Sequence, residues 1–186
     1  MKLLSVAIPC YNSEAYMRNC IHSLLAGGEE VEIIIVDDGS RDGTAAIADE
    51  YAEKYPTIVK AVHQENGGHG EAVNAGLRNA TGLYFKVVDS DDWVSISAYK
   101  EILKTLEKLA GAKPMVDMLI SNFVYEKEGA KHKKVMSYRS AFPQDQVFTW
   151  DDVKFLHMGQ RMVHKDVIHI EGVLWQIQST LPQQLG

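Results

Sequence analysis

The sequence lacks the features that mark several large classes of protein. It has only two cysteines, Cys10 and Cys20, among 186 residues. That is too few for a disulfide scaffold and is typical of a chain that folds in a reducing compartment. No apolar run approaches the roughly 18 residues needed to cross a bilayer. Met1–Val6 runs straight into an expected strand, without the small-residue cleavage site of a signal peptide. The sequence therefore predicts a cytoplasmic location.

Positive charge is also scarce. Lys and Arg number 19 against 25 Asp and Glu, which gives a net charge of −6. This balance argues against nucleic acid as the main partner, because phosphate binding needs a basic face. Pro9–Ser13 stands where a dinucleotide-binding glycine motif would follow the first strand, and no P-loop occurs. Both absences count against a dinucleotide-dependent oxidoreductase or a nucleotidyltransferase.

What is present is an alternation of strand-like and helix-like segments in one domain-sized chain. The apolar, β-branched runs are Leu3–Ile8, Glu32–Val36, Ile58–His63 and Leu83–Val88. Helical spacing follows in residues 14–25, 43–54, 71–79 and 97–109. Short strands are expected at 116–121 and 122–126, a helix at 150–156 and a strand at 161–163. Strands buried on both faces and joined by helices predict an α/β fold with a mainly parallel sheet.

Polar turns follow three of these strands. They are Pro9–Asn12, Asp37–Ser40 and Asp89–Asp92. Right-handed crossovers place the carboxyl ends of parallel strands at one edge of the sheet, where open α/β folds bind their ligands. We therefore expect the three turns to converge, although they are far apart in the sequence.

The third turn groups three carboxylates, those of Asp89, Asp91 and Asp92, where a strand ends. Like charges a few Å apart repel one another. A hard divalent cation bound through oxygen ligands would relieve that repulsion and would let an acidic site hold a diphosphate. The alternative interpretation is a solvated acidic turn that caps the helix near Ile96.

Four stretches in this order resemble the family 2 glycosyltransferases, which have the GT-A (nucleotide-diphospho-sugar transferase) fold. They are residues 5–25, 32–44, 66–82 and 84–93. An acidic triplet alone is a weak signal, whereas four ordered blocks in strand–loop–helix context are specific. The resemblance implies a Rossmann-like three-layer sandwich with a mainly parallel central sheet. It also implies a donor-binding core at 1–125 and an incomplete acceptor-side region of the same domain at 126–186.

The resemblance carries roles for residues near the first two turns. Asp38 resembles the family's uracil-reading aspartate, which accepts a hydrogen bond from a base N–H. Pro9, Tyr11 and Glu14 fall where the family forms the wall of the nucleoside pocket. Tyr11 would offer a ring face on which the base can stack.

Further roles fall on the second half of the resemblance. Asn74 and Arg78 lie on the helix after the glycine-rich loop, whose N-terminal N–H groups would face phosphate or sugar. Asp89 and Asp91 match the family's metal-binding acidic triplet, which in relatives holds Mn²⁺ or Mg²⁺. Asp91 is the expected metal ligand, Asp89 is expected mainly on the ribose, and Asp92 is the alternative ligand.

The implied reaction moves a sugar from a nucleotide diphosphate, in particular a UDP-sugar, to the hydroxyl of a saccharide or lipid-linked acceptor, with inversion. The metal would neutralise the leaving diphosphate, and a carboxylate general base would take the acceptor proton. A lipid-linked acceptor would bring the protein to the inner face of the membrane.

The general base of the family is not evident in this sequence. Glu171 lacks the family context, and Asp151 and Asp152 fit the first turn of a helix better. The chain therefore resembles a transferase truncated at its C-terminal side. A non-catalytic nucleotide-sugar-binding domain, or an inactive fragment, is the alternative. Of the remaining side chains, Cys10 is expected to be a small buried hydrophobe, and His69 is interpreted as solvated rather than catalytic.

Overall fold

The computed structural model describes residues 2–113, 116–125, 134–137, 146–147 and 173–176. The chain divides into two compact units, Met1–Asp117 with Leu174–Gly186 and Met118–Val173. The expected helix at 150–156 and strand at 161–163 lie outside the described residues. The division into 1–125 and 126–186 stays a prediction.

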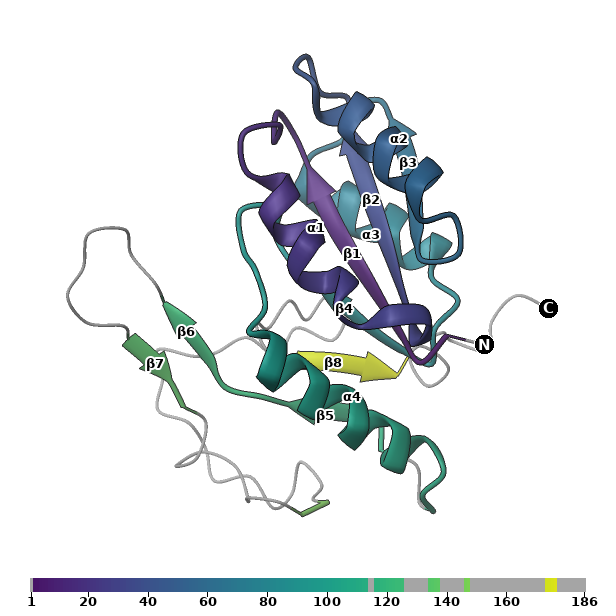
Figure 1. Ribbon diagram of the computed structural model, residues 1–186, viewed down its shortest axis with the longest axis vertical. Coiled ribbons are helices and arrows are strands. Elements are labelled where there is room, and N and C mark those ends of the chain that lie inside the picture. Colours follow the sequence, from purple (N-terminus) through teal and green to yellow (C-terminus); the bar gives the residue numbers. More distant parts are fainter. Residues whose placement is uncertain (1, 114–115, 126–133, 138–145, 148–172, 177–186) are drawn as a thin grey trace. The chain divides into compact units, whose positions relative to one another are not determined.

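The first unit is built on a parallel sheet (Figure 1). Its strands are β1 (Leu4–Cys10), β2 (Val31–Asp38), β3 (Val59–Gln64) and β4 (Tyr84–Val87), in the order β3-β2-β1-β4. All three neighbouring pairs are parallel. Every residue of β1 and β2 is buried, as expected for central strands covered on both faces. The mainly parallel sheet predicted from the sequence is confirmed.

Helices cover both faces of this sheet. They are α1 (Met17–Leu25), α2 (Thr44–Lys54), α3 (His69–Asn79) and α4 (Ile96–Ala110), with a short 3₁₀ turn η1 (Gly28–Glu30) before β2. In Figure 1, α1 and α2 lie in front of the sheet and α3 lies behind it. The chain steps from β1 to β2 to β3 and then returns past β1 to β4, so a right-handed crossover puts α3 on the opposite face. The reversal leaves a topological switch point between β1 and β4.

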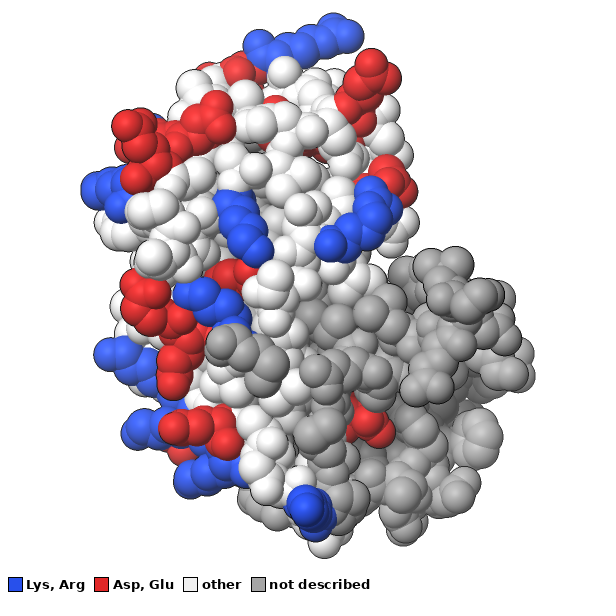
Figure 2. Space-filling model, turned by 90° about the vertical axis from the view of Figure 1, so that its right-hand side faces the viewer, with Lys and Arg blue, Asp and Glu red and all other residues white. Residues whose placement is uncertain are grey.

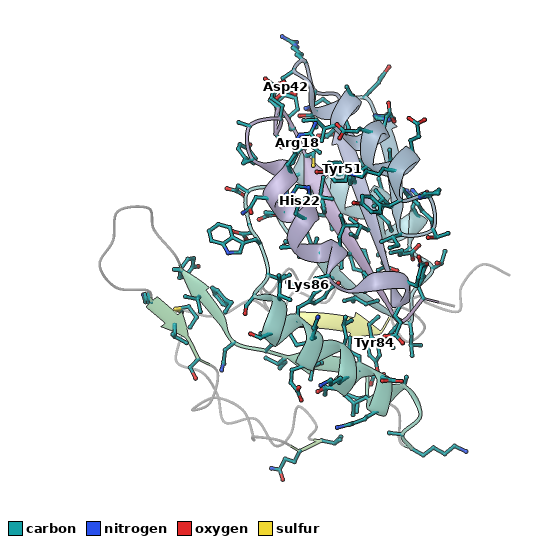
Figure 3. The ribbon with its side chains drawn as sticks, in the orientation of Figure 1. Arg18, His22, Asp42, Tyr51, Tyr84 and Lys86 are labelled. Atoms are coloured by element: carbon teal, nitrogen blue, oxygen red, sulfur yellow. The ribbon has the colours of Figure 1, made fainter. Side chains whose placement is uncertain are left out.

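Close packing fixes both helical layers. A Cβ atom on Gly76 of α3 would collide with the Cβ atom of Ala7 on β1, so glycine is required there. On the other face, Arg18 and His22 of α1 point toward Tyr51 of α2 (Figure 3). The Tyr51 hydroxyl lies 2.6 Å from His22 Nε2, and the Arg18 guanidinium stands 5.5 Å from the centre of the Tyr51 ring. These contacts join α1 to α2.

A buried carboxylate organises the amino edge of the sheet, where the strands begin. Glu32 on β2 is 2% exposed. Its Oε1 accepts hydrogen bonds from the Ser5 hydroxyl (2.6 Å), from Thr81 and from the Gly82 N–H (3.0 Å). Its Oε2 accepts one from Lys60 Nζ (2.7 Å). Burial alone would raise the pKa of Glu32, but the bonds from Lys60, Ser5 and Thr81 outweigh it and lower the pKa to about 2.

Two local features differ from the sequence prediction. The helix expected to begin at Glu14 begins at Met17, because the Ser13 carbonyl accepts the N–H groups of Tyr16 and Met17 while its hydroxyl is bonded elsewhere. A strand was also missed: β8 (Val173–Gln176) pairs antiparallel with β4. Such a short strand is defined by its tertiary partner rather than by its own periodicity.

The second unit contains three short strands in its described part. They are β5 (Met118–Ile120), β6 (Phe123–Tyr125) and β7 (Lys134–Met136). β6 and β7 form an antiparallel pair, and β5 and β6 match the strands expected at 116–121 and 122–126.

None of the described helices is both long enough and apolar enough to span a bilayer. On the face in Figure 2, the described acidic and basic side chains are interspersed and form no continuous basic patch.

Candidate functional site

The turn after β1 is fastened to the turn after β2. Asn12 has a φ of 51°, a left-handed backbone conformation that residues other than glycine and asparagine rarely adopt. In this conformation its N–H donates to the Ser40 hydroxyl (3.0 Å) and its Oδ1 accepts the Arg41 N–H (2.9 Å). The two turns are therefore held as one surface at the carboxyl edge of the sheet.

Glu14 belongs to this fastening. Its N–H donates to Asp42 Oδ2 (3.2 Å), and its carboxylate accepts the N–H of Gly43. A Cβ atom on Gly43 would lie 2.6 Å from that carboxylate, so the contact depends on glycine. Asp42 also binds the first residue of α2, because its Oδ1 accepts the Thr44 N–H (3.0 Å). The structure thus gives Glu14 a bond between loops and does not include it in the pocket lining.

The acidic turn after β4 rests on the same loop. The hydroxyls of Ser13 and Ser90, both buried, are 2.9 Å apart and hydrogen-bonded. Within the turn, the Asp92 N–H donates to the carbonyl of Asp89 (2.9 Å). Asp91 and Asp92 are exposed, and Asp89 is half-buried. The expected convergence of the three polar turns is therefore confirmed.

Asp38 anchors the glycine-rich loop. Its side chain is buried, its Oδ1 accepts bonds from Gln64 Nε2 (2.7 Å) and the Gly67 N–H (2.8 Å), and its Oδ2 accepts one from the Gly68 N–H (2.8 Å). Burial would raise the pKa of Asp38, but these bonds outweigh it and lower the pKa. A carboxylate offers about four lone-pair positions. One is left for the base N–H that the sequence prediction assigns to it.

A pocket of about 310 Å³ opens between the end of β1, the end of β2 and the glycine-rich loop. Its lining is Pro9, Cys10, Tyr11, Asp38, Asn66, Gly68, His69 and Ala72. The Tyr11 side chain is 48% exposed, so its ring is accessible to a ligand. Three of these positions, Pro9, Tyr11 and Asp38, were predicted from the sequence. Gly68 stands at the helix N-terminus that was expected to face phosphate or sugar, whereas Asn66 and Ala72 were not predicted as site residues.

Cys10 lines the pocket without being a reactive thiol. Burial, followed by the charge of Asp37, raises the pKa of Cys10 to about 12. A thiol with such a pKa stays protonated at neutral pH and is a poor nucleophile. The expectation that Cys10 is a small buried hydrophobe is confirmed.

The first turn of α3 faces this region, but its expected donor-binding side chains are engaged elsewhere. Asn74 Nδ2 donates to Glu71 Oε2 (3.2 Å), and Arg78 Nη2 donates to Glu71 Oε1 (2.6 Å). All three side chains are exposed, and neither Asn74 nor Arg78 is in the pocket lining. The helix begins with Gly68 as its N-cap and without a side-chain cap.

Asp89 shows how the site fits a divalent cation. Its Oδ1 is buried and has no hydrogen-bond partner, and His69 Nε2 lies 3.8 Å away. Among the described residues, no three His, Cys, Asp or Glu side chains form a cluster that could hold a metal. The residues therefore suit a cation held by one or two carboxylates together with substrate phosphates, as Mg²⁺ commonly is, rather than by an all-protein cage.

Comparison with known proteins connects this architecture to one family. The model of the family described as "Glycosyl transferase family 2" matches residues 5–170. Glycosyltransferase GlyG of Streptococcus pneumoniae is 37% identical over 66% of this chain. The uncharacterized glycosyltransferase YibD of Escherichia coli is 44% identical over 54% of it. The chain spans 39% and 29% of their lengths, and 35% of another relative.

Solved structures show the same fold. A crystal structure of S. aureus TarS in complex with UDP is 31% identical, with a TM-score of 0.54, and the match covers 64% of this chain and 35% of that one. The mannosyltransferase PcManGT from Pyrobaculum calidifontis, in complex with GDP-Man and Mn²⁺, is 25% identical over 63% of this chain and 34% of its own, with a TM-score of 0.53. The predicted GT-A type of fold is confirmed by these neighbours.

Proposed function

Because this chain belongs to glycosyl transferase family 2, we propose that it binds a nucleotide-diphosphate sugar at the carboxyl edge of its sheet and transfers the sugar to an acceptor hydroxyl. The observation that carries the proposal is the pocket itself. It is lined by residues at the carboxyl ends of β1 and β2, and the acidic turn after β4 is hydrogen-bonded to the loop that follows β1. Open α/β sheets bind nucleotides at this edge.

The nucleoside is assigned to the pocket between Tyr11 and the glycine-rich loop. Tyr11 presents an exposed ring on which a base can stack. Asp38 Oδ2 accepts a single hydrogen bond, from the Gly68 N–H, so it keeps an acceptor position that suits a base N–H such as that of uracil. TarS holds UDP in a similar fold, and this likeness supports a UDP-sugar as the donor.

The diphosphate is assigned to the space between the acidic turn and the start of α3. A divalent cation, Mn²⁺ or Mg²⁺, would supply the positive charge that offsets negative charge on the leaving diphosphate. Asp89, Asp91 and Asp92 are the carboxylates placed to hold it, with Asp91 exposed and Asp89 carrying the unpartnered buried oxygen. The uncapped N–H groups of α3 favour the remaining phosphate charge.

The transfer step is proposed to invert the anomeric carbon. A general base then has to remove the proton of the acceptor hydroxyl on the face opposite the diphosphate. Glu171, the nearest acid in sequence to the place where the family carries its base, lies outside the described residues. The acceptor is a saccharide or a lipid-linked hydroxyl. Nucleotide-sugar binding without transfer is the alternative that the experiment must separate.

Calorimetry with UDP, in the presence and absence of Mn²⁺, tests the binding half. We expect Asp91→Ala to weaken Mn²⁺-dependent UDP affinity at least about tenfold, because a charged ligand is lost, while metal-free affinity changes little. Glu107→Ala, an exposed acid on α4, is the matched control. Equal Mn²⁺-dependent affinity in wild type and Asp91→Ala would remove the metal assignment.

Sugar release from radiolabelled UDP-sugars, with and without candidate acceptors, tests the transfer half. Acceptor-dependent release shows a transferase. Binding of UDP without release from any donor shows a binding domain instead. Absence of UDP binding in the wild-type protein contradicts both functions.

A further inference from the structure

His69 lies between the pocket and the acidic turn. It is the first residue of α3 and lines the pocket, and its Nε2 is 3.8 Å from Oδ1 of Asp89. The loop before it is anchored, because the N–H groups of Gly67 and Gly68 both donate to Asp38. The imidazole is therefore brought to the acidic turn by a fixed backbone.

The distance between the two side chains suits a shared cation better than a hydrogen bond. An N–H···O hydrogen bond has a donor–acceptor distance of about 2.7–3.2 Å, and 3.8 Å is well beyond it. Two ligand atoms that each lie about 2.1 Å from one cation are about 3.0 Å apart at an octahedral angle of 90° and about 3.8 Å apart at 130°, so the two side chains need to move by less than about 1 Å to share a cation.

The state of Asp89 supports the same interpretation. Its Oδ1 is buried and accepts no hydrogen bond, which is costly for a carboxylate oxygen unless a ligand binds it. An ion pair with a protonated His69 is the competing explanation. That pair would be weak, because the His69 side chain is 57% exposed, and it would still leave Oδ1 without a hydrogen bond.

On the basis of the proposed donor-binding function, we propose that His69 is itself a metal ligand. Its Nε2 and Oδ1 of Asp89 bind the same divalent cation, whose other ligands are Asp91, diphosphate oxygens and water. A nitrogen ligand alters cation choice, because Mg²⁺ prefers oxygen and transition metals accept imidazole with affinity rising from Mn²⁺ to Co²⁺. The glycine-rich loop, rather than the aspartates, then sets the preference for a transition metal.

Calorimetry of Mn²⁺, Co²⁺ and Mg²⁺ in the presence of saturating UDP tests the assignment. We expect His69→Gln to weaken Co²⁺ most, Mn²⁺ by at least about tenfold and Mg²⁺ least, since only the imidazole contribution is removed. His22→Gln is the matched control, because His22 is an exposed histidine at the end of α1 that contacts Tyr51. An equal loss for all three cations in His69→Gln would contradict a nitrogen ligand.

Pulsed electron paramagnetic resonance of the Mn²⁺–UDP complex gives a readout that does not depend on activity. A directly bound imidazole produces nitrogen coupling, which we expect in the wild-type protein and in His22→Gln but not in His69→Gln. Bound Mn²⁺ without nitrogen coupling in the wild type, coupling that persists in His69→Gln, or no Mn²⁺ binding at all would each overturn the assignment. UDP affinity measured without metal keeps this result separate from the proposed donor binding, which fails only if the nucleotide does not bind.

Discussion

At the amino edge of the sheet the buried carboxylate of Glu32 has every partner it needs, whereas at the carboxyl edge Asp89 keeps a buried oxygen without one. Both groups belong to the same unit, at opposite ends of parallel strands. Glu32 binds a lysine and the backbone of the turn before β4. Asp89 faces a histidine at a distance too long for a hydrogen bond.

This difference indicates that the two edges of one sheet have different roles, one in folding stability and the other in ligand binding. Satisfied buried polar groups fix a structure, and unsatisfied ones are retained where a ligand completes them. The amino edge should therefore contribute to folding and little to affinity. The carboxyl edge should contribute to affinity and less to folding.

Removing Glu32 should give the largest effect on stability. Glu32→Ala removes the acceptor of the buried Ser5 hydroxyl and Gly82 N–H and leaves Lys60 only the Asn79 carbonyl, so we expect a loss of about 3 to 5 kcal/mol in the free energy of unfolding. Urea denaturation measures it. Glu53→Ala, an exposed acid on α2, should change stability by less than about 0.5 kcal/mol. Equal unfolding free energies for Glu32→Ala and Glu53→Ala would contradict the stabilising role of Glu32.

The pH dependence of stability provides a second test of the contribution of Glu32. The pKa of Glu32 is lowered from 4.5 to about 2 in the folded protein. Its contribution is therefore present above about pH 4.5 and is lost as the pH falls toward 2, an effect of about 3 kcal/mol. The unfolding free energies of wild type and Glu32→Gln should therefore differ at pH 4.5 and converge as the pH falls toward 2. Parallel pH profiles of the two proteins would count against a charged, paired Glu32.

Asp38→Asn should give a smaller loss of stability with a clear loss of affinity. The new amide group turns its NH₂ donor toward the N–H of either Gly67 or Gly68, which bind different oxygens of Asp38, and we expect a cost of about 1 to 2 kcal/mol. Metal-free UDP affinity should fall in the same variant. Glu65→Gln, exposed in the same loop, controls for lost charge. Unchanged UDP binding in Asp38→Asn would remove the base-reading role.

The smallest effect is expected at His63, on the edge strand β3. Asp49 raises the pKa of His63 above 6.5, burial opposes this, and Asp37 adds to it. This stability is present below about pH 6.5 and is lost as the pH rises through the raised pKa. The ring is 42% exposed, so we expect less than about 1 kcal/mol. Unfolding at pH 6 and 8.5, compared with His63→Gln, measures it; an opposite slope would contradict the assignment.

The fold was largely predictable because its central strands are buried on both faces and therefore read as unbroken apolar runs. The strand at Val173–Gln176 was not predicted, because four residues are too few to show a hydrophobic periodicity. The strand is defined by its pairing with Tyr84 and Phe85 of β4. The start of α1 was also mispredicted. The Ser13 hydroxyl binds the Tyr11 N–H and the Ser90 hydroxyl instead of capping the helix, and only tertiary structure reveals that competition.

The site was predictable where chemistry resides in side chains and less so where it resides in the backbone. Asp38 was identified by the resemblance of residues 32–44 to the family, but the N–H donors that bind it come from a loop in which glycines leave no side-chain signal. Glu71, Asn74 and Arg78 are spaced three and four residues apart and share one helical face. That face is exposed, whereas Ala72 and Ala75 are buried.

The pairing of β4 with β8 has a consequence for biosynthesis. β1, β2, β3 and β4 can associate soon after they leave the ribosome, but Tyr84 has to wait for Gln176. Until then the nascent chain exposes an open strand edge next to its acidic turn, and open edges invite association with other chains. Shielding by a chaperone during this interval would favour correct maturation over aggregation.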